Sequence, residues 1–284
     1  HFFSLEKKQQ ERACITKLLT EQGEVTDDDE ILHEARTFYR KLYQSEPVDI
    51  DTQDELIRQM TTSVNERSKT ECEGPVTKTE VNEALKRMHT NKSPGPDGLT
   101  TEFYRMFWDV LGEDLIELFN NNFLEGEMSP SQRESLLRLL FKKNERELLT
   151  NWRPISLLNT DYKLLATTLA IRLRRTLPEV IHEDQTCGIP GRTIFDSVLR
   201  LRDITYEATM KNTNLILLSL DQEKAFDRVD RNFLFKIMEH LNYGSSFIRW
   251  IKTLYAGANC RIINNGWMSE TIDLERGVRQ GCPL

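Results

Sequence analysis

The sequence lacks the cysteine spacing of a zinc site or of a disulfide framework. Its five cysteines are far apart, with no Cys-x-x-Cys pair and no nearby histidine cluster: Cys14, Cys72, Cys187, Cys260 and Cys282. Structural zinc sites need closely spaced Cys and His ligands, and disulfide-rich domains are usually short and secreted. We therefore expect reduced thiols in an intracellular protein.

The sequence also lacks a long hydrophobic run. No apolar stretch approaches the ~20 residues that a membrane-spanning helix needs, so we expect no membrane partner. The opening HFFSLEKKQQ has no positive segment followed by an apolar one, which argues against a signal peptide. Because the first residue is His1 and not Met, we expect the chain to have been cut from a longer protein. With 38% hydrophobic and 29% charged residues, its 284 residues can form a core and stay soluble.

An overall positive charge is missing too, because the formal net charge is −7. Residues 1–80 hold 18 acidic and 11 basic side chains, whereas the remaining 204 positions hold 27 of each. Within the latter, residues 133–175 carry ten Lys or Arg against four acids. Nucleic acids respond to local positive charge, because phosphate contacts act at short range and release counterions. This basic segment is a candidate nucleic-acid surface; a solvated helix face is the alternative.

Hydrophobic periodicity predicts helices over most of the chain. The first 45 residues should be helical around a break at Gly23, with Thr26 as N-cap of an amphipathic helix whose first turn is acidic. Residues 46–75 are polar, with a linker around 45–54, and residues 91–100 form a loop rich in Pro and Gly. Further helices are expected over 77–89, 100–126, 161–177, 231–241 and 245–257.

Strands are expected mainly in the second half of the chain. Residues 135–143 and 152–158 should each form one, and residues 259–274 form a hairpin because Asn265-Gly266 suits a type I′ turn. The segment 214–221 (NLILLSLD) is apolar on both faces, which predicts a buried central strand. Helices followed by mixed strands and helices indicate an α+β fold.

Asp221 would end that central strand, so its carboxylate would emerge at a sheet edge above a rigid backbone. Hard Mg²⁺ prefers oxygen ligands held in fixed geometry, which makes the position suitable for a metal ligand. A single strand-end aspartate is weak support, however, because a capping or turn role explains it equally well.

Five segments, in order, resemble motifs of the reverse transcriptases of non-LTR (LINE-type) retrotransposons. The segment LDQEKAFDRVD resembles the first palm motif, and LERGVRQGCPL resembles the start of the template-gripping motif. Three others resemble finger segments: NKSPGPDGLTTEFYR, NWRPISLLNTDYKLLATTLAIRL and HEDQTCGIPGRTIFD. The resemblance covers about residues 75–284, and the opening FFSLEKK looks like the region upstream in vertebrate LINE elements.

This resemblance implies a right-hand polymerase fold and an RNA-directed DNA polymerase that works by target-primed reverse transcription. Residues 1–75 would form a helical N-terminal extension and linker, 76–212 the fingers, and 213–284 the first part of the palm. The implied partners are an RNA template, a DNA primer and deoxynucleoside triphosphates. The implied cofactor is Mg²⁺, two ions in the complete enzyme, and the implied locations are the nucleus and a cytoplasmic ribonucleoprotein.

The resemblance also assigns roles around the reacting nucleotide. Asp221 matches the first metal-binding catalytic aspartate, and the carbonyl of Gln222 matches another metal contact. Phe226 matches the aromatic that excludes a 2′-hydroxyl, although a core aromatic is an equally good interpretation of its position. Arg153 matches the finger arginine that holds the triphosphate, for which a forked guanidinium is suited. Gln280 and Gly281 match residues that touch the template and the forming base pair, whereas a polar turn is their plain interpretation.

Two departures from the family pattern affect the remaining assignments. Lys142 matches a second triphosphate-binding residue, but Lys143 fits nearly as well because Phe141 stands where the family often has proline. Either lysine could equally be a solvated turn residue. Arg192 matches a basic residue near the template backbone, but Cys187-Gly188 replaces the usual Gly-Phe beside it.

The sequence lacks the Tyr/Phe-x-Asp-Asp segment that supplies the family's other catalytic aspartates. The run at 27–29 belongs to a helix cap, and we interpret Asp230 as a cap and Asp227 as structural. The expectation is a polymerase fragment that ends at Leu284 inside the template-gripping motif and is inactive alone. The rival is a catalytically dead RNA-binding remnant, and the sequence encoded after Leu284 would distinguish the two. A helical scaffold unrelated to nucleic acid is a third, less supported interpretation.

Overall fold

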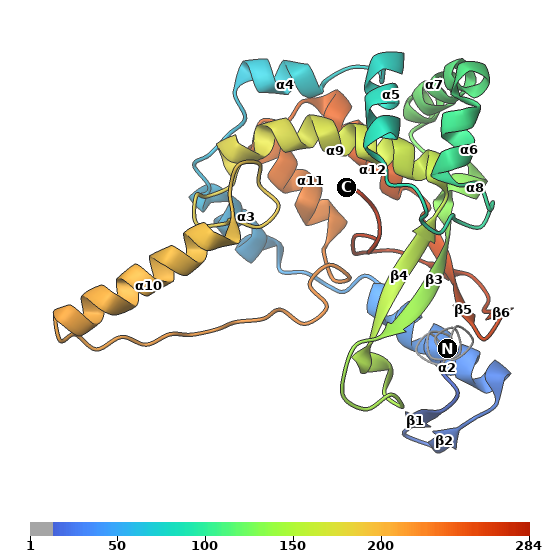
Figure 1. Cartoon of the computed structure of the whole chain (residues 1–284), viewed down its shortest axis with the longest axis horizontal. Helices are drawn as coiled ribbons and strands as arrows, with labels where there is room; N and C mark the ends of the chain where they lie inside the picture. Colours follow the sequence, from blue (N-terminus) through green and yellow to red (C-terminus); the bar gives the residue numbers. More distant parts are fainter. Residues whose placement is uncertain (1–13) are drawn as a thin grey trace.

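The computed structural model describes residues 14–284 as a mixed fold of helices and two β-sheets, shown in Figure 1. The smaller sheet is a hairpin of β1 (Leu18–Thr20) and β2 (Gly23–Val25), in which Gly23 has a φ of +124°. The expectation of helix before Gly23 is therefore wrong for residues 14–22, since this part of the chain contains the first strand of the hairpin. The part of that expectation that falls on residues 1–13 lies outside the described residues.

Helix α2 (Asp28–Tyr43) confirms the predicted amphipathic helix, but its cap is one residue later than expected. The Asp27 carboxylate, not the side chain of Thr26, accepts from the backbone N–H groups of Asp29 and Glu30. A carboxylate at this position satisfies helix N–H groups and also favours the positive end of the helix dipole.

The remaining predicted helices are present, with several differences; α4 and α8, for example, had not been predicted. The linker expected around 45–54 is interrupted, because α3 already begins at Ile50, and α10 had not been predicted. The long helix expected over 100–126 is broken at Phe107, and Thr100 makes no side-chain cap. The helices are α3 (Ile50–Gln59), α4 (Glu66–Cys72), α5 (Lys78–Arg87), α6 (Thr101–Met106), α7 (Trp108–Glu125), α8 (Pro130–Arg133), α9 (Thr160–Val180), α10 (Ile194–Met210), α11 (Arg231–His240) and α12 (Ser245–Tyr255).

The larger sheet has the order β4-β3-β5-β6, with β7 also paired to β5. Strand β3 pairs antiparallel with β4 and parallel with β5, and a short 3₁₀ helix (Leu149–Asn151) precedes β4. The predicted turn is confirmed, because Asn265 and Gly266 both have positive φ between β5 and β6. The strands are β3 (Glu134–Phe141), β4 (Trp152–Leu158), β5 (Asn259–Asn264), β6 (Trp267–Met268) and β7 (Ile272–Asp273).

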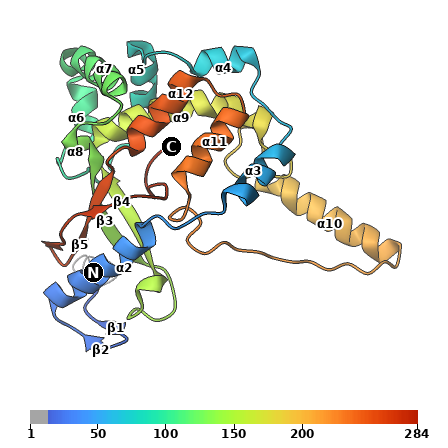
Figure 2. The ribbon, with the colours of Figure 1, turned by 180° about the vertical axis from the view of Figure 1, so that it is seen from behind.

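Two hydrophobic cores hold these elements together. In one, α2 covers a single face of the large sheet, with Ile31 and Tyr39 against Leu137, Trp152 and Ile262. The other core is helical and joins α5, α7, α9, α11 and α12, and Figure 2 shows α9, α11 and α12 side by side from behind. The opposite face of β3 and β4 carries the exposed side chains of the two strands.

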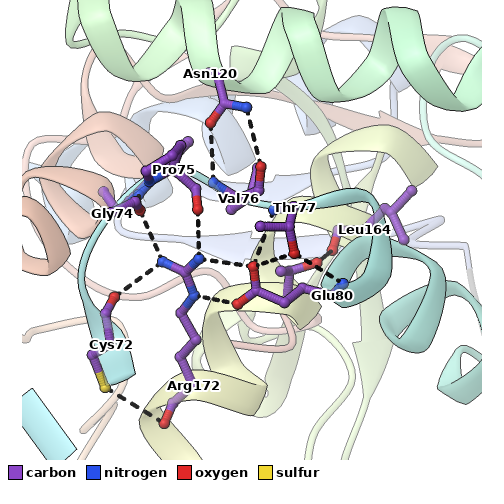
Figure 3. A network of polar contacts seen from close by, with 11 residues as sticks. Cys72, Gly74, Pro75, Val76, Thr77, Glu80, Asn120, Leu164 and Arg172 are labelled. Carbon is purple, nitrogen blue, oxygen red and sulfur yellow. Dashed lines mark hydrogen bonds and ion pairs between the residues drawn. The ribbon is translucent and has the colours of Figure 1, made fainter. Parts of the chain in front are cut away.

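Arg172 of α9 ties the helical core together, as Figure 3 shows. Its side chain is 4% exposed and donates to the Glu80 carboxylate at 2.7 and 2.9 Å. It also donates to the carbonyl oxygens of Cys72, Gly74 and Pro75, at 3.0, 3.0 and 2.8 Å. One residue of the basic segment therefore serves the interior and not a nucleic-acid surface.

The predicted central strand over 214–221 is absent. These residues have no strand assignment and all are exposed, Ile216 at 89% and Leu220 at 82%. Figure 1 shows the segment as a long trace that returns from the far end of α10 to the body of the protein. A strand is stable only when its N–H and C=O groups pair, and no strand between residues 14 and 284 runs beside it.

The division expected at residues 75/76 and 212/213 stays a prediction. Contacts cross it, because β5 pairs with β3 and Trp250 of α12 donates to the carbonyl of Gly74. All five cysteines are free thiols, as expected. In the part of the chain that the structure describes, no helix is long and apolar enough to cross a membrane.

Candidate functional site

Backbone hydrogen bonds hold the segment 277–281, which contains the expected template-contacting residues, against β4 and the 226–229 turn. Gly277 donates to the Val229 carbonyl and Val278 to that of Phe226, both at 2.8 Å. The N–H of Ser156 in β4 donates to the carbonyl of Gln280 at 2.7 Å. The structure thus brings together β4, the 226–229 turn and Gln280.

Two glycines make this close seating possible. A Cβ on Gly277 would lie 2.6 Å from the Asp227 carbonyl oxygen, and one on Gly281 would lie 2.7 Å from that of Ser156. Both also have positive φ, +83° and +115°, which an L side chain adopts only with strain. Glycine at 281 is therefore required by the contact with β4, whatever Gly281 touches in nucleic acid.

Three arginines that sequence reasoning did not single out hold the same part of the chain: Arg276 and Arg279, which are buried, and Arg231, which is partly buried. Arg231 donates to the carbonyls of Leu274 and Gly277 at 2.5 and 3.0 Å, and burial lowers its pKa to about 10. Arg279 lies 4.2 Å from the ring centre of Tyr162. Arg276 donates to the carbonyl of Leu42 at 2.9 Å and pairs with Glu46 at 2.8 Å. The signal available in the sequence was only their density beside Gly277.

Asp227 lies beneath this segment and is 1% exposed. Its Oδ2 accepts from Gln280 Nε2 at 2.9 Å, and the Tyr43 hydroxyl also hydrogen-bonds to it. Burial raises the pKa of the Asp227 carboxyl, although the bond from Gln280, the charge of Lys224 and the bond from Tyr43 oppose the rise. This burial is consistent with the structural role expected for Asp227. Asp230 is confirmed as the cap of α11, because it accepts from the Phe233 N–H at 2.6 Å.

The exposed face of β3 and β4 carries two arginines beside Gln280. Arg153 and Arg138 both point to the side away from α2, where their neighbours in register are Leu140 and Ile155. Among residues 14–284 neither forms an ion pair. Arg153 is three residues from Ser156, whose N–H donates to the Gln280 carbonyl. Strand β4 therefore carries Arg153 and also holds the 277–281 segment.

The lysine candidates lie where β3 ends. The N–H of Lys142 continues the pairing with the carbonyl of Asn151 at 2.9 Å, and the side chains of both Lys142 and Lys143 are exposed. The choice between them stays open. Lys224, unnoticed in the sequence, donates to the Trp152 carbonyl at 3.4 Å, and burial lowers its pKa despite nearby Asp227. It brings the 222–228 turn against the start of β4.

The three residues assigned to the metal and the sugar have exposed side chains: Asp221, Gln222 and Phe226. Phe226 is 65% exposed. A core role for the Phe226 ring does not fit that exposure, although its carbonyl is anchored. Within residues 14–284 no three His, Cys, Asp or Glu side chains are grouped to hold a metal ion. The described donors are therefore fewer than a two-metal site requires.

Arg192 faces its own loop. Its guanidinium donates to the carbonyls of His182, Gln185 and Ile181, at 2.6, 2.9 and 3.0 Å. The loop of 181–192 thereby closes ahead of α10. These bonds use much of the donor capacity of the guanidinium, so the expected template contact would need rearrangement or the remaining N–H groups.

Comparison with known proteins identifies related sequences. Residues 141–284 match the family model described as reverse transcriptase (RNA-dependent DNA polymerase). The whole chain is 44% identical to the transposon TX1 uncharacterized 149 kDa protein of Xenopus laevis, of which it covers 22%. Over 70% of its length it is 26% identical to the Pol polyprotein of the type-2 retrotransposable element R2DM of Drosophila melanogaster, covering 18% of it.

A further relative is the RNA-directed DNA polymerase of the mobile element jockey from Drosophila funebris, 26% identical over 74% of the chain. The chain covers 23% of that protein, so it spans only about a fifth of the length of these relatives. The matched region includes β4, the 222–229 turn and the seated segment 277–281. The chain belongs to the reverse transcriptase family, in the branch of non-LTR retrotransposon proteins.

Proposed function

We propose that the chain forms the nucleotide- and template-facing part of an RNA-directed DNA polymerase that copies retrotransposon RNA into DNA. The observation that carries this proposal is the seating of 277–281 on β4 and on the 226–229 turn, by bonds of 2.7 to 2.8 Å. It places Gln280 beside the strand that bears Arg153. A guanidinium on an open sheet face can bind triphosphate oxygens in a bidentate manner.

In this proposal β3 and β4 are fingers strands, and the 221–229 segment belongs to the palm. Arg153, with Lys142 or Lys143, would hold the triphosphate, while Phe226 would lie against the sugar. Gln280 and Gly281 would touch the template and the forming pair. The resemblance supports target-primed synthesis, a DNA primer, Arg192 near the template and a nuclear location.

The resemblance implies two Mg²⁺ ions, with Asp221 and the Gln222 carbonyl as ligands in this chain. Divalent metal would polarise the phosphate and activate the primer hydroxyl. Asp221 stands alone among the described residues, without two further acidic, Cys or His neighbours that would complete a site. We therefore derive no step through the metal from this chain.

A salt titration tests the nucleic-acid surface. Binding of a labelled RNA–DNA primer–template by the 284-residue chain should weaken steeply with salt. With about four to six phosphate contacts, log K against log salt should slope at roughly −3 to −5. Arg192→Ala, which removes the cation proposed near the template backbone, should make the slope shallower by about 1. Arg67→Ala, on distant α4 and with an 86% exposed side chain, is the matched control and should leave the slope unchanged.

Salt-independent binding, or an equal effect of the two alanine variants, would contradict this assignment. Primer extension separates the polymerase from its rival, a catalytically dead RNA-binding remnant. We expect the chain alone to add no nucleotide with Mg²⁺ or Mn²⁺, since one carboxylate cannot hold two metals. A longer protein that contains the chain should extend the primer, and Asp221→Asn should abolish that extension. Extension by the Asn variant would remove Asp221 from the site.

A further inference from the structure

A part-buried hydrogen bond between Asp227 and Gln280 joins two segments that are about fifty residues apart. The chemistry of the two side chains fixes which of them donates. A carboxylate can only accept hydrogen bonds, so it must face the amide nitrogen of Gln280 and not its carbonyl oxygen. The observed bond, Nε2 to Oδ2 at 2.9 Å, agrees. The Gln280 carbonyl oxygen is therefore the atom turned away from Asp227.

The acceptor is itself anchored by α2. Tyr43, the last residue of α2, is buried and its hydroxyl hydrogen-bonds to Asp227. The carbonyl of Tyr43 accepts from the N–H groups of Glu275 and Arg276, each at 3.2 Å. The end of α2 thus holds residues 275 and 276 by backbone hydrogen bonds. It holds the Gln280 side chain through Asp227.

We propose that Asp227 is a positioning residue, anchored by Tyr43, which fixes the Gln280 amide so that its carbonyl oxygen faces the template or incoming nucleotide. The inference rests on the proposed role of Gln280 at the forming base pair. Glutamine has three side-chain torsions, and ordering them before binding removes an entropic cost from the binding step. The groups around the pair are Tyr43, Lys224 and the seated backbone of 277–281.

The chain offers a matched control. Asp161 on α9 is a partly buried carboxylate whose pKa is raised by burial, and it accepts from the amide of Gln132 at 2.8 Å. Its glutamine partner belongs to α8 and not to the 277–281 segment. Replacing either aspartate removes a hydrogen bond from a glutamine amide, but only Asp227 bonds to the 277–281 segment.

The first experiment observes Gln280 directly in the full chain. With selective ¹⁵N-glutamine labelling, its side-chain NH₂ signal, assigned by its loss in Gln280→Leu, should lie away from the position of a solvated amide. It should move to that position in Asp227→Leu and stay in Asp227→Asn, which keeps an acceptor oxygen. Tyr43→Phe should move it part of the way. A wild-type signal at the solvated position would overturn the proposal.

The second experiment is a double-mutant cycle on primer–template binding by the same chain. Asp227→Leu should weaken binding about 3- to 10-fold, the cost of ordering one long side chain, and Asp227→Asn should restore most of it. In the Gln280→Leu background Asp227→Leu should have no further effect, because the positioned group is gone. Asp161→Leu should leave binding unchanged while lowering the unfolding temperature.

An equal loss in the Gln280→Leu background would show that Asp227 acts on structure alone, and would overturn the positioning role. Failure of the wild-type chain to bind any primer–template would contradict the proposed function instead. The glutamine signal would then still decide whether Asp227 fixes Gln280. If Asp227→Leu does not fold, the milder pair Asp227→Asn and Tyr43→Phe carries both experiments.

Discussion

Arg172 places a guanidinium in the helical core, where it joins α9 to α5 and to the segment 72–75. The sequence contained the signal for this: Leu165, Leu169 and Thr176 lie at helical spacing from Arg172, and all are buried. Counting charge alone placed Arg172 with the basic surface. Position on the helix decides whether an arginine faces phosphate or protein.

Arg172→Met should lower the free energy of unfolding by about 3 to 5 kcal/mol, because it leaves the partly buried Glu80 and three carbonyls without their donor. Urea unfolding followed by circular dichroism measures this. The neighbouring Arg174 is exposed, so Arg174→Met should change stability by less than about 0.5 kcal/mol. Similar losses in both variants would show that helix charge, and not the buried network, is responsible.

The same variant carries a pH dependence. Burial alone would raise the pKa of Glu80, but hydrogen bonds from Arg172 and Thr77 lower it below the ordinary glutamate value of 4.5. A lowered folded-state pKa contributes stability above the unfolded value, and that contribution is lost as pH falls through the folded one. The difference in stability between wild type and Arg172→Met should therefore be constant near pH 7 and shrink below pH 4.5. A difference that grows on acidification would contradict the pairing.

Among the elements, two pairs of strands that are close in sequence were predictable. The hairpin around Asn265 and the pair β3–β4 followed from turn residues and alternation. The segment 214–221 had an equally clear apolar pattern, yet it is not a strand. Apolar residues on both faces indicate a need for burial, whereas strand structure requires a paired neighbour, which no local pattern reports. The break at Phe107 and the β1–β2 hairpin also depend on tertiary contacts.

In the candidate site, too, local features could be predicted from the sequence, whereas contacts between distant residues could not. The identity of Arg153, Phe226 and Gln280 could be proposed from local motifs. The bond between Asp227 and Gln280, and the part that Tyr43 has in it, could not. Those contacts join residues about fifty and about one hundred and eighty positions apart, and only the folded chain brings them together.

The exposed segment 214–220 should make the chain prone to association. Ile216 and Leu218 are 89% and 77% exposed within an uncharged β-prone run, and such runs pair with other copies. Ile216→Lys with Leu218→Lys should lower light scattering on concentration without changing the unfolding temperature. A matched control is Val110→Lys with Leu124→Lys on α7, both exposed in the wild type. Equal solubilisation by the two pairs would mean that added charge alone is responsible.

At the scale of the whole molecule, the region that matches the family model is not a folding unit. Strand β3, residues 134–141, lies almost wholly before residue 141, yet it is the strand between β4 and β5. Helix α2 covers that sheet, and α5 completes the helical core. The region that matches the family model thus packs against elements that extend far toward the N-terminus.

Residues 141–284 produced alone should therefore lack cooperative unfolding, whereas residues 14–284 should show it. Thermal denaturation followed by near-ultraviolet circular dichroism compares the two, because aromatic signals report fixed packing. Trp152 and Trp250, both fully buried here, should give the transition in the longer chain only. A sharp transition in the 141–284 piece would show that the matched region is self-sufficient.

The parallel pairing of β3 with β5 also fixes an order of events during synthesis. Glu134 pairs with Asn259, about 125 residues later. At roughly 5–20 residues per second, the ribosome needs about 6 to 25 seconds to deliver that partner. Throughout this interval the edge of β3 that later pairs with β5 has unpaired N–H and C=O groups. Arg138 is the one charged side chain among the central residues 135–140. The nascent β3–β4 hairpin is therefore the stage at which this chain most needs protection by a chaperone.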